Sequence, residues 1–353
     1  MMTEYFNQCV QQDGHVNNQN KFILRIENIQ GHLIPDDNLV SNKVAAKSID
    51  NPLLPFSNVD KSLLKQTICP IRYREFKESF PLQVRKNLYE TTHYLHSANK
   101  LSNPNIQTKL LSSMSKTIMF DLYNKTLAGF FQRPESPPFY CRPFCVGLKA
   151  LYSRHSVNTM MDCKSYLGRN DIDIIHGDKI NQLIHVSQFI LHLPPLSSPP
   201  NNSFVIHDDP SNYLLHHVNL VELLRQRAMV KCNSLKQMIV SNEGCSLEKI
   251  PKENQIQALH KCGSLAVNVA TAHLEYKMLE DLLLSKTDII RQPILSRLVL
   301  LDTLVKIQDD LGWIVSNRLL SEEVSMAIPF LIYDLSHVLT PHILTLVDSF
   351  ELQ

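Results

Sequence analysis

The feature that most constrains the fold is a succession of long segments in which apolar residues recur with helical spacing. Residues 107–131 carry such a stripe, from Leu110 and Leu111 through Met114 and Ile118 to Leu127. The same pattern predicts helices over 145–165, 179–192, 212–240, 255–285, 293–316 and 321–350. Because only one short β-like run, residues 22–26, precedes them, we expect a mainly α fold with two helical bundles.

Helix ends are marked by polar residues and prolines. Ser321, followed by Glu322 and Glu323, has the side chain of an N-cap with acids in the first turn. Thr340 and a following proline predict the start of a further helix. The single tryptophan, Trp313, lies within an apolar stripe and is expected in the core.

Composition divides the chain into five parts. Residues 1–21 are polar and rich in Asn and Gln, which predicts disorder. Residues 22–70 hold the β-like run and an irregular stretch, and residues 71–192 are mostly helical. A Pro- and Ser-rich linker, residues 193–204, separates them from a second helical domain over 205–353.

Charge and cysteine usage restrict the functional class. A net charge of +1 argues against a nucleic-acid-binding surface, which needs clustered basic residues. The eight cysteines are scattered and no secretory signal opens the chain, so we expect reduced thiols in an intracellular protein. We expect no membrane span, because no uninterrupted apolar run reaches the roughly 18 residues that a span needs. We also expect no metal site, because no cysteines or histidines have the spacing of metal ligands.

Several short phrases occur in the order found in one enzyme family. They are Arg25-Ile26-Glu27-Asn28, Tyr73-Arg74-Glu75-Phe76, Gly147-Leu148-Lys149-Ala150, His176-Gly177-Asp178, Ala272-His273-Leu274-Glu275-Tyr276 and Leu346-Val347-Asp348-Ser349-Phe350. In this order the chain resembles the acyl-CoA oxidase family over roughly residues 22–353. The resemblance implies the C-terminal half of that fold: two helical-bundle domains, with residues 22–70 as a remnant of the β domain.

The resemblance also implies a reaction and a site. Members of the family use FAD to oxidise acyl-CoA to trans-2-enoyl-CoA and reduce O2 to H2O2, in peroxisomal fatty-acid β-oxidation. By resemblance Arg74, Phe76, Gly177 and Asp178 bind the flavin, and His176 stands at the catalytic position. An acyl-CoA substrate and a homodimer follow from the same resemblance. The last three residues are not a peroxisomal address, so the cytoplasm is the other expected compartment.

The departures from the family pattern bear on activity. The family has a glutamate where this chain has His176, and a positioned base is commonly worth about 10²–10⁴-fold in rate. A glycine-rich loop of the family is shortened after Cys163 to a stretch with one glycine, Gly168. The family's N-terminal helical domain and most of its β domain are missing. Three readings stay open: an oxidase, a non-catalytic relative (a pseudoenzyme) that provides an interaction or dimerisation surface, and an incomplete gene product.

Overall fold

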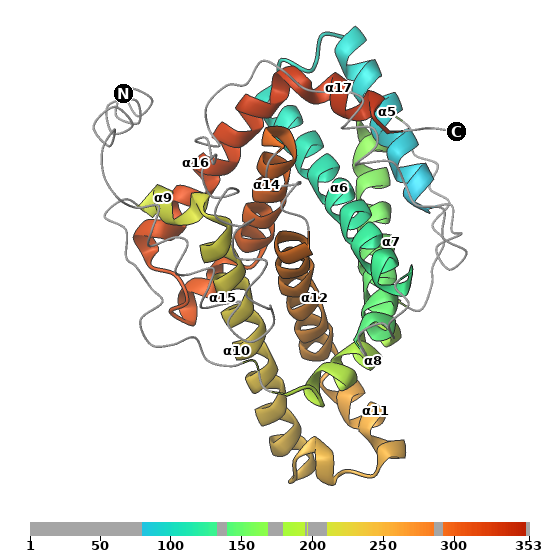
Figure 1. Cartoon of the computed structure of the whole chain (residues 1–353), viewed down its shortest axis with the longest axis vertical. Helices are drawn as coiled ribbons and strands as arrows, with labels where there is room; N and C mark the ends of the chain where they lie inside the picture. The colour runs from blue at the N-terminus through green and yellow to red at the C-terminus, as the bar shows by residue number, and fades with distance from the viewer. Residues whose placement is uncertain are drawn as a thin grey trace. The chain divides into compact units, whose positions relative to one another are not determined.

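Helices dominate the part of the chain that the structure describes. The computed structural model describes residues 80–132, 140–168, 179–194, 196, 210–285 and 292–350. In chain order the elements are α5 (Phe80–Ser97), α6 (Pro104–Gln132), α7 (Cys141–Leu167), α8 (Lys179–Leu191), α9 (Pro210–Leu215), α10 (His217–Glu243), η4 (Leu247–Lys249), α11 (Lys252–Lys261), α12 (Gly263–Ser285), α14 (Pro293–Asp309), α15 (Leu311–Ser316), α16 (Glu322–Leu339), η5 (Thr340–His342) and α17 (Ile343–Asp348) (Figure 1).

These ranges contain no strand, which confirms the mainly α prediction. The β-like run at 22–26 lies outside the described residues. Helix α12 takes the central position: it packs against α6, α7, α8 and α10, and Figure 1 shows it between α10 and the pair α6 and α7. Helix α5 packs on α7 and α17, and α14 packs on α6 and α16. The described residues all lie in one compact unit with a continuous apolar core.

Helices from both sides of the predicted linker take part in that core. Helix α8 comes before residues 193–204 and packs against α12, which comes after them. Helix α6 likewise packs against α14. Most of the linker lies outside the described residues. The division into separate domains at this point stays a prediction.

The first three predicted helices are confirmed as α6, α7 and α8, whereas three of the later ones are each divided in two. The breaks fall at His216, Cys262 and Asp310, and at His216 the backbone is extended, with φ −95° and ψ 115°. Helix α7 begins at Cys141, two residues before Pro143. Pro143 falls in its first turn, where a missing N–H breaks no helical hydrogen bond.

The end signals near the C-terminus are confirmed in part. The Ser321 hydroxyl accepts a hydrogen bond from the Val324 backbone N–H at 3.3 Å, so Ser321 is the N-cap of α16. A break occurs near Thr340, but Thr340 is not an N-cap. It is the C-cap of α16, and its hydroxyl donates to the Ser336 carbonyl at 2.8 Å. The ring of Trp313 is half-buried at the edge of the core, whereas the sequence predicted it inside.

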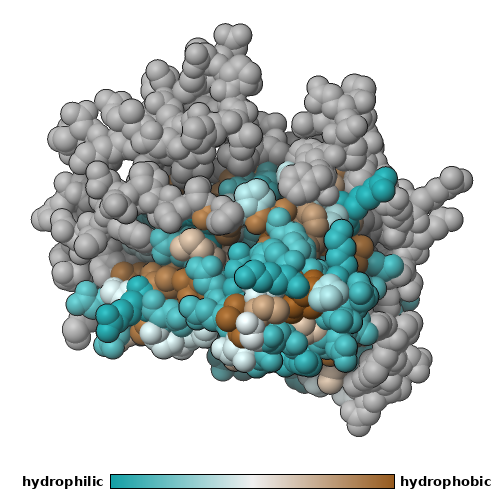
Figure 2. All heavy atoms as spheres, turned by 90° about the horizontal axis from the view of Figure 1, so that it is seen from below, coloured by the Kyte–Doolittle hydropathy of each residue, from teal (hydrophilic) through white to brown (hydrophobic). Residues whose placement is uncertain are grey.

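One described stretch, Glu322–Asp348, is long and apolar enough by composition to cross a membrane, although polar residues interrupt it. It spans α16, η5 and α17, and α16 buries one side against α6, α9 and α14. A core helix passes the same test of length and composition. Figure 2 shows one face of the molecule, where hydrophilic residues surround smaller apolar areas.

Candidate functional site

The residues that the sequence assigned to a flavin site fall outside the described part of the chain. Arg74 and Phe76 precede α5. His176, Gly177 and Asp178 lie between the end of α7 and the start of α8. The structure therefore does not bring these residues together or separate them, and their roles stay predictions. The helices on either side of the His176 segment are described.

The end of α7 uses its glycine as a helix cap. Gly168 has φ 67°, in the left-handed region, and its backbone N–H points back to the carbonyls of Lys164 and Ser165. A glycine adopts this conformation without the penalty that a Cβ imposes. Because the helix takes up this N–H, Gly168 does not supply the open backbone cradle that a flavin pyrophosphate would need.

An ion pair holds the same end of α7 to α6. Lys109 Nζ lies 2.8 Å from Asp162 Oδ1 and 5.9 Å from the centre of the Tyr166 ring. The hydrogen bond to Asp162 raises the pKa of Lys109. At the other side of the segment, Lys179 opens α8 and burial lowers its pKa. The described flanks of the segment are thus a capped helix end and a helix start that carries a lysine.

The Gly147 phrase of the family resemblance forms a close helix contact. A Cβ on Gly147 would lie 2.6 Å from Leu274 Cδ1 and 3.2 Å from Val186 Cγ2. Only a residue without a side chain lets α7 approach α12 and α8 this closely. The glycine of this phrase therefore serves packing.

The Ala272–Tyr276 phrase faces the interior as well. Leu274 meets Gly147, and His273 packs its ring edge-on against Phe144 and Tyr276. Burial lowers the pKa of His273 to about 4, so this imidazole is neutral in the folded protein near pH 7. Its surroundings are those of a core residue.

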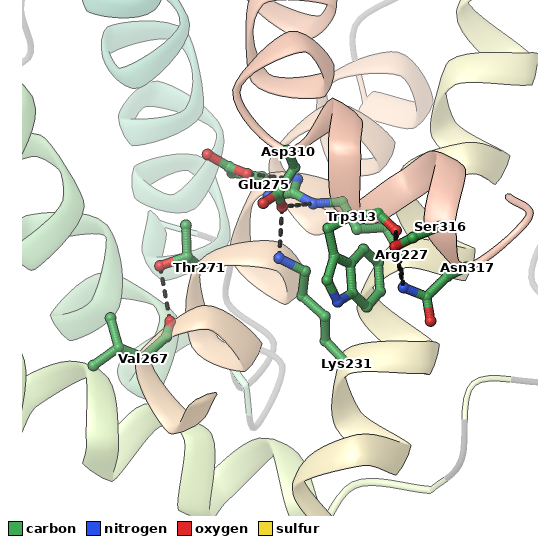
Figure 3. A network of polar contacts seen from close by, with 9 residues as sticks. All are labelled: Arg227, Lys231, Val267, Thr271, Glu275, Asp310, Trp313, Ser316 and Asn317. Carbon is green, nitrogen blue, oxygen red and sulfur yellow. Dashed lines mark hydrogen bonds and ion pairs between the residues drawn. The ribbon is translucent and has the colours of Figure 1, made fainter. Parts of the chain in front are cut away.

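A cluster of charged residues, Arg227, Lys231, Glu275 and Asp310 with Trp313 beside them, joins α10, α12 and α15 (Figure 3). We call it the Arg227 cluster. Arg227 Nη1 donates to Glu275 Oε2 at 2.8 Å and its Nε donates to Asp310 Oδ2 at 2.6 Å. Lys231 Nζ also donates to Asp310 Oδ2, at 2.6 Å, and lies 4.6 Å from the centre of the Trp313 ring. Two cations thus meet two anions.

The pKa shifts in the Arg227 cluster follow from burial and pairing. Burial opposes the charge on Glu275, but Arg227 outweighs it and lowers the pKa of Glu275. Burial likewise opposes the charge on Asp310, and Arg227 and Lys231 lower its pKa. Burial lowers the pKa of Lys231 despite the bond to Asp310. The pairs stabilise the charged forms of both carboxylates, as expected of a structural ion-pair network.

A second polar cluster lies further along α12. Asp281 accepts a hydrogen bond from the Tyr123 hydroxyl at 3.2 Å and pairs with Lys277 Nζ at 2.9 Å. Lys277 also pairs with Glu280 at 2.5 Å and lies 5.3 Å from the centre of the Tyr140 ring. Burial raises the pKa of Asp281 and raises that of Tyr123 well above its usual value. These contacts join α12 to α6 and to the start of α7.

The C-terminal phrase of the resemblance completes a third contact. Arg85 on α5 pairs with Asp121 on α6 at 2.5 Å, and the Tyr152 hydroxyl of α7 donates to the same carboxylate at 3.3 Å. The Arg85 guanidinium lies 5.6 Å from the centre of the Phe350 ring. Phe350 therefore anchors the end of the described chain to α5.

These clusters indicate what the described helices can do. Among the described residues no group of three metal-binding side chains converges. Their buried ion pairs link neighbouring helices, and reasoning from sequence missed the Arg227 cluster. The signal in the sequence was that Arg227 and Lys231, four residues apart, continue the buried stripe of Leu220, Leu224 and Leu235.

Comparison with known proteins agrees with the resemblance. Residues 218–353 match the family model for acyl-CoA oxidase. The structure is similar to Arabidopsis thaliana acyl-CoA oxidase 1, with a TM-score of 0.63 and 14% identity over 84% of this chain and 52% of that one. Caenorhabditis elegans acyl-CoA oxidase-1 has a TM-score of 0.60 and 11% identity, over 82% of this chain and 48% of that one.

Acyl-CoA oxidase 1 from Yarrowia lipolytica has a TM-score of 0.56 and 15% identity, over 71% of this chain and 44% of that one. The chain thus spans about half the length of these solved oxidases. No curated protein matches it in sequence. The chain is an acyl-CoA oxidase-like protein, and its described helices have the fold of the helical C-terminal part of acyl-CoA oxidases.

Proposed function

We propose that this acyl-CoA oxidase-like chain has lost acyl-CoA oxidation and acts as a helical interaction and dimerisation protein. The observation that carries the proposal is His176, which stands where the resemblance requires the catalytic glutamate. In the family reaction a carboxylate removes a proton from the carbon beside the thioester carbonyl. An imidazole differs from a carboxylate in reach and geometry, and a lost base costs about 10²–10⁴-fold in rate.

The packing of the described helices also supports the proposal. The phrases that carry the resemblance are used in packing: Gly147 against Leu274, Glu275 against Arg227, and Phe350 against Arg85. Each would be kept by a chain that needs the fold alone. A chain that retains the packing residues while it changes the base has the pattern expected of a non-catalytic relative.

The flavin is the cofactor that the family implies. When bound, FAD accepts a hydride from the acyl chain and passes electrons to O2. Arg74 and Phe76 are the residues that would hold it by resemblance. The described residue nearest to the family's glycine loop, Gly168, does not fit this role, because its N–H is bonded to the helix that it caps. We therefore propose weak or absent flavin retention.

Flavin retention and peroxide formation test the proposal directly. The purified chain is mixed with FAD, passed through a gel-filtration column and measured by visible absorption. Peroxide formation is then followed with palmitoyl-CoA as substrate. We expect no retained flavin absorbance and no peroxide. Near-stoichiometric flavin together with peroxide production would contradict the proposal.

Two substitutions at one position separate loss of the base from loss of the site. If the flavin site survives, His176→Glu restores peroxide formation and the matched His176→Gln does not. If the unmodified chain already forms peroxide and His176→Gln abolishes it, the histidine is a working base. In that case the oxidase reading replaces the non-catalytic one.

We propose the family's homodimer for the assembly and the peroxisome for the compartment, with the cytoplasm as the other candidate. Fluorescence microscopy of the full chain with a peroxisomal marker distinguishes the two compartments.

A further inference from the structure

Helix α16 presents a row of large apolar side chains to solvent. Met326, Phe330 and Tyr333 are 65%, 59% and 49% exposed, and they follow one another at spacings of four and three residues. At 100° per residue these positions lie on one face of the helix. The opposite face, with Ile328, Leu335 and Leu339, is fully buried. Helix α16 is therefore apolar on both sides, and only one side is covered.

Two polar residues extend the same row at its ends. Glu323 precedes Met326 by three residues and His337 follows Tyr333 by four, and both are exposed. The five positions thus repeat with the 3-4 spacing of a coiled-coil seam, over a length of about 21 Å. We call Glu323, Met326, Phe330, Tyr333 and His337 the α16 seam. Its ends differ in charge character, with a carboxylate at one end and an imidazole at the other.

We propose that the α16 seam packs antiparallel against the α16 seam of a second copy of this chain. A two-fold axis near Phe330 brings each Glu323 toward the second copy's His337, which can donate a hydrogen bond to the carboxylate. A parallel arrangement would place carboxylate against carboxylate. Because an isologous interface must complement itself, the opposite ends of the seam favour the antiparallel pair.

A membrane surface fits the seam less well. Helix α16 contains no lysine or arginine, and Glu322, Glu323 and Asp334 lie on or beside its exposed side. Anionic lipids attract basic residues and repel acidic ones. A second copy covers the apolar side chains and also pairs the acidic end with a donor.

The inference rests on the proposed function, because it names the surface through which the dimerisation protein would dimerise. One helix pair buries less than the roughly 1,200 Å² of a standard interface. We therefore expect association in the micromolar range, about −8 kcal/mol, unless other parts of the chain add contacts.

The oligomeric state of the full chain tests the seam. Sedimentation velocity over about 1 to 100 μM should show a monomer–dimer equilibrium. Phe330→Glu with Tyr333→Glu buries charge in the interface and should weaken association at least about tenfold. Met238→Glu is the matched control: Met238 is 45% exposed on α10, a different helix from the seam, so the dimer of this variant should be unchanged. Circular dichroism checks that each variant keeps its helices.

A charge exchange tests the antiparallel arrangement. Glu323→Lys should weaken the dimer, because each lysine then faces the second copy's His337. Adding His337→Glu to this variant should restore the dimer, because each lysine then faces a carboxylate of the second copy. A dimer that the Phe330 and Tyr333 changes leave intact would overturn the seam, and so would a chain that stays monomeric throughout.

These outcomes are independent of catalysis. Peroxide formation would overturn the proposed loss of oxidation whatever the mass of the chain. A dimer that survives the Phe330 and Tyr333 changes would overturn the seam alone, whereas a monomer would also overturn the proposed dimerisation. Binding of the chain to neutral lipid vesicles that Phe330→Glu abolishes, with no dimer in solution, would assign the seam to a membrane surface instead.

Discussion

Gly147 and Leu274 approach each other so closely that a Cβ on Gly147 would lie 2.6 Å from Leu274 Cδ1. We expect Gly147→Ala to destabilise the protein by about 1 kcal/mol. An alanine gains about 1 kcal/mol of helix propensity, but overpacking the core costs about 1–3 kcal/mol. Gly147→Val should cost more. Thermal unfolding measures both changes.

Gly312 provides the control for that substitution. It lies on α15, and a Cβ added to it would meet no atom within 4 Å, so Gly312→Ala should leave the melting temperature unchanged or raise it. Equal melting temperatures for the Gly147→Ala variant and the unmodified protein would mean that α12 moves away at no cost.

The Arg227 cluster predicts a large loss of stability when its central cation is removed. We expect Arg227→Met to lower the free energy of unfolding by about 3–5 kcal/mol, because it leaves the buried Glu275 carboxylate without its partner. Removing both charges with Arg227→Met and Glu275→Leu should recover much of the loss. Urea unfolding followed by circular dichroism gives the values.

An exposed ion pair serves as the comparison. Lys86 and Glu90 lie 3.8 Å apart on α5 with side chains that are 66% and 41% exposed. Lys86→Ala should change the free energy of unfolding by less than about 1 kcal/mol. If Lys86→Ala and Arg227→Met cost the same, the Arg227 cluster is not the buried network that its geometry indicates.

Buried histidines predict a loss of stability in acid. Burial lowers the pKa of His217 and that of His273 to about 4, from about 6.5 in an unfolded chain. Between about pH 6.5 and about pH 4 the histidines bind protons in the unfolded state but not in the folded state. The free energy of unfolding therefore decreases as the pH is lowered through this range. Each histidine contributes up to about 1.4 kcal/mol per pH unit over this window. Urea midpoints between pH 7 and 4.5 measure the slope.

A substitution isolates the histidine contribution from that of the carboxylates. His273→Gln should flatten the slope over the same window, and the matched His185→Gln, at an exposed position of α8, should not. Parallel curves for all three proteins would show that His273 takes up its proton without unfolding.

The N-cap of α16 predicts a smaller effect. Ser321→Ala removes the acceptor for the Val324 N–H and should cost about 0.5–1 kcal/mol. Ser321→Asn retains an acceptor and should recover most of it. The melting temperatures of the two variants give the comparison, because the variants differ only in the hydrogen-bond acceptor at this exposed residue. An alanine variant as stable as the asparagine variant would show that water replaces the cap.

The sequence predicted most helices in place and the break near Thr340, but it did not predict three other breaks. The apolar stripes of 212–240, 255–285 and 293–316 continue through His216, Cys262 and Asp310, so periodicity alone has no reason to stop there. Helix α5 was not predicted as a separate element. Its buried face includes the polar Arg85, Thr91 and Thr92, which interrupt the apolar pattern.

Sequence patterns could not predict the charged clusters, because their members are far apart in the chain. Arg227 and Glu275 are 48 residues apart in the chain, and Arg227 and Asp310 are 83 apart. No spacing rule relates such positions, because only the packing of α10, α12 and the junction of α14 with α15 brings them together. The predicted flavin residues, by contrast, came from family phrases and lie outside the described residues.

The Arg227 cluster has a consequence for how the protein opens. Helices α10 and α12 and the junction of α14 with α15 share its charges, so none of these parts can leave without stranding an ion in the apolar interior. Their backbone amides should therefore exchange with deuterium in one cooperative event, with similar free energies. Helix α5 contributes no charge to the cluster and contacts α17 through the exposed pair of His93 and Asp348, so it can open separately. Backbone amides near the Arg227 cluster would then exchange slowly and together, and those of α5 would exchange faster.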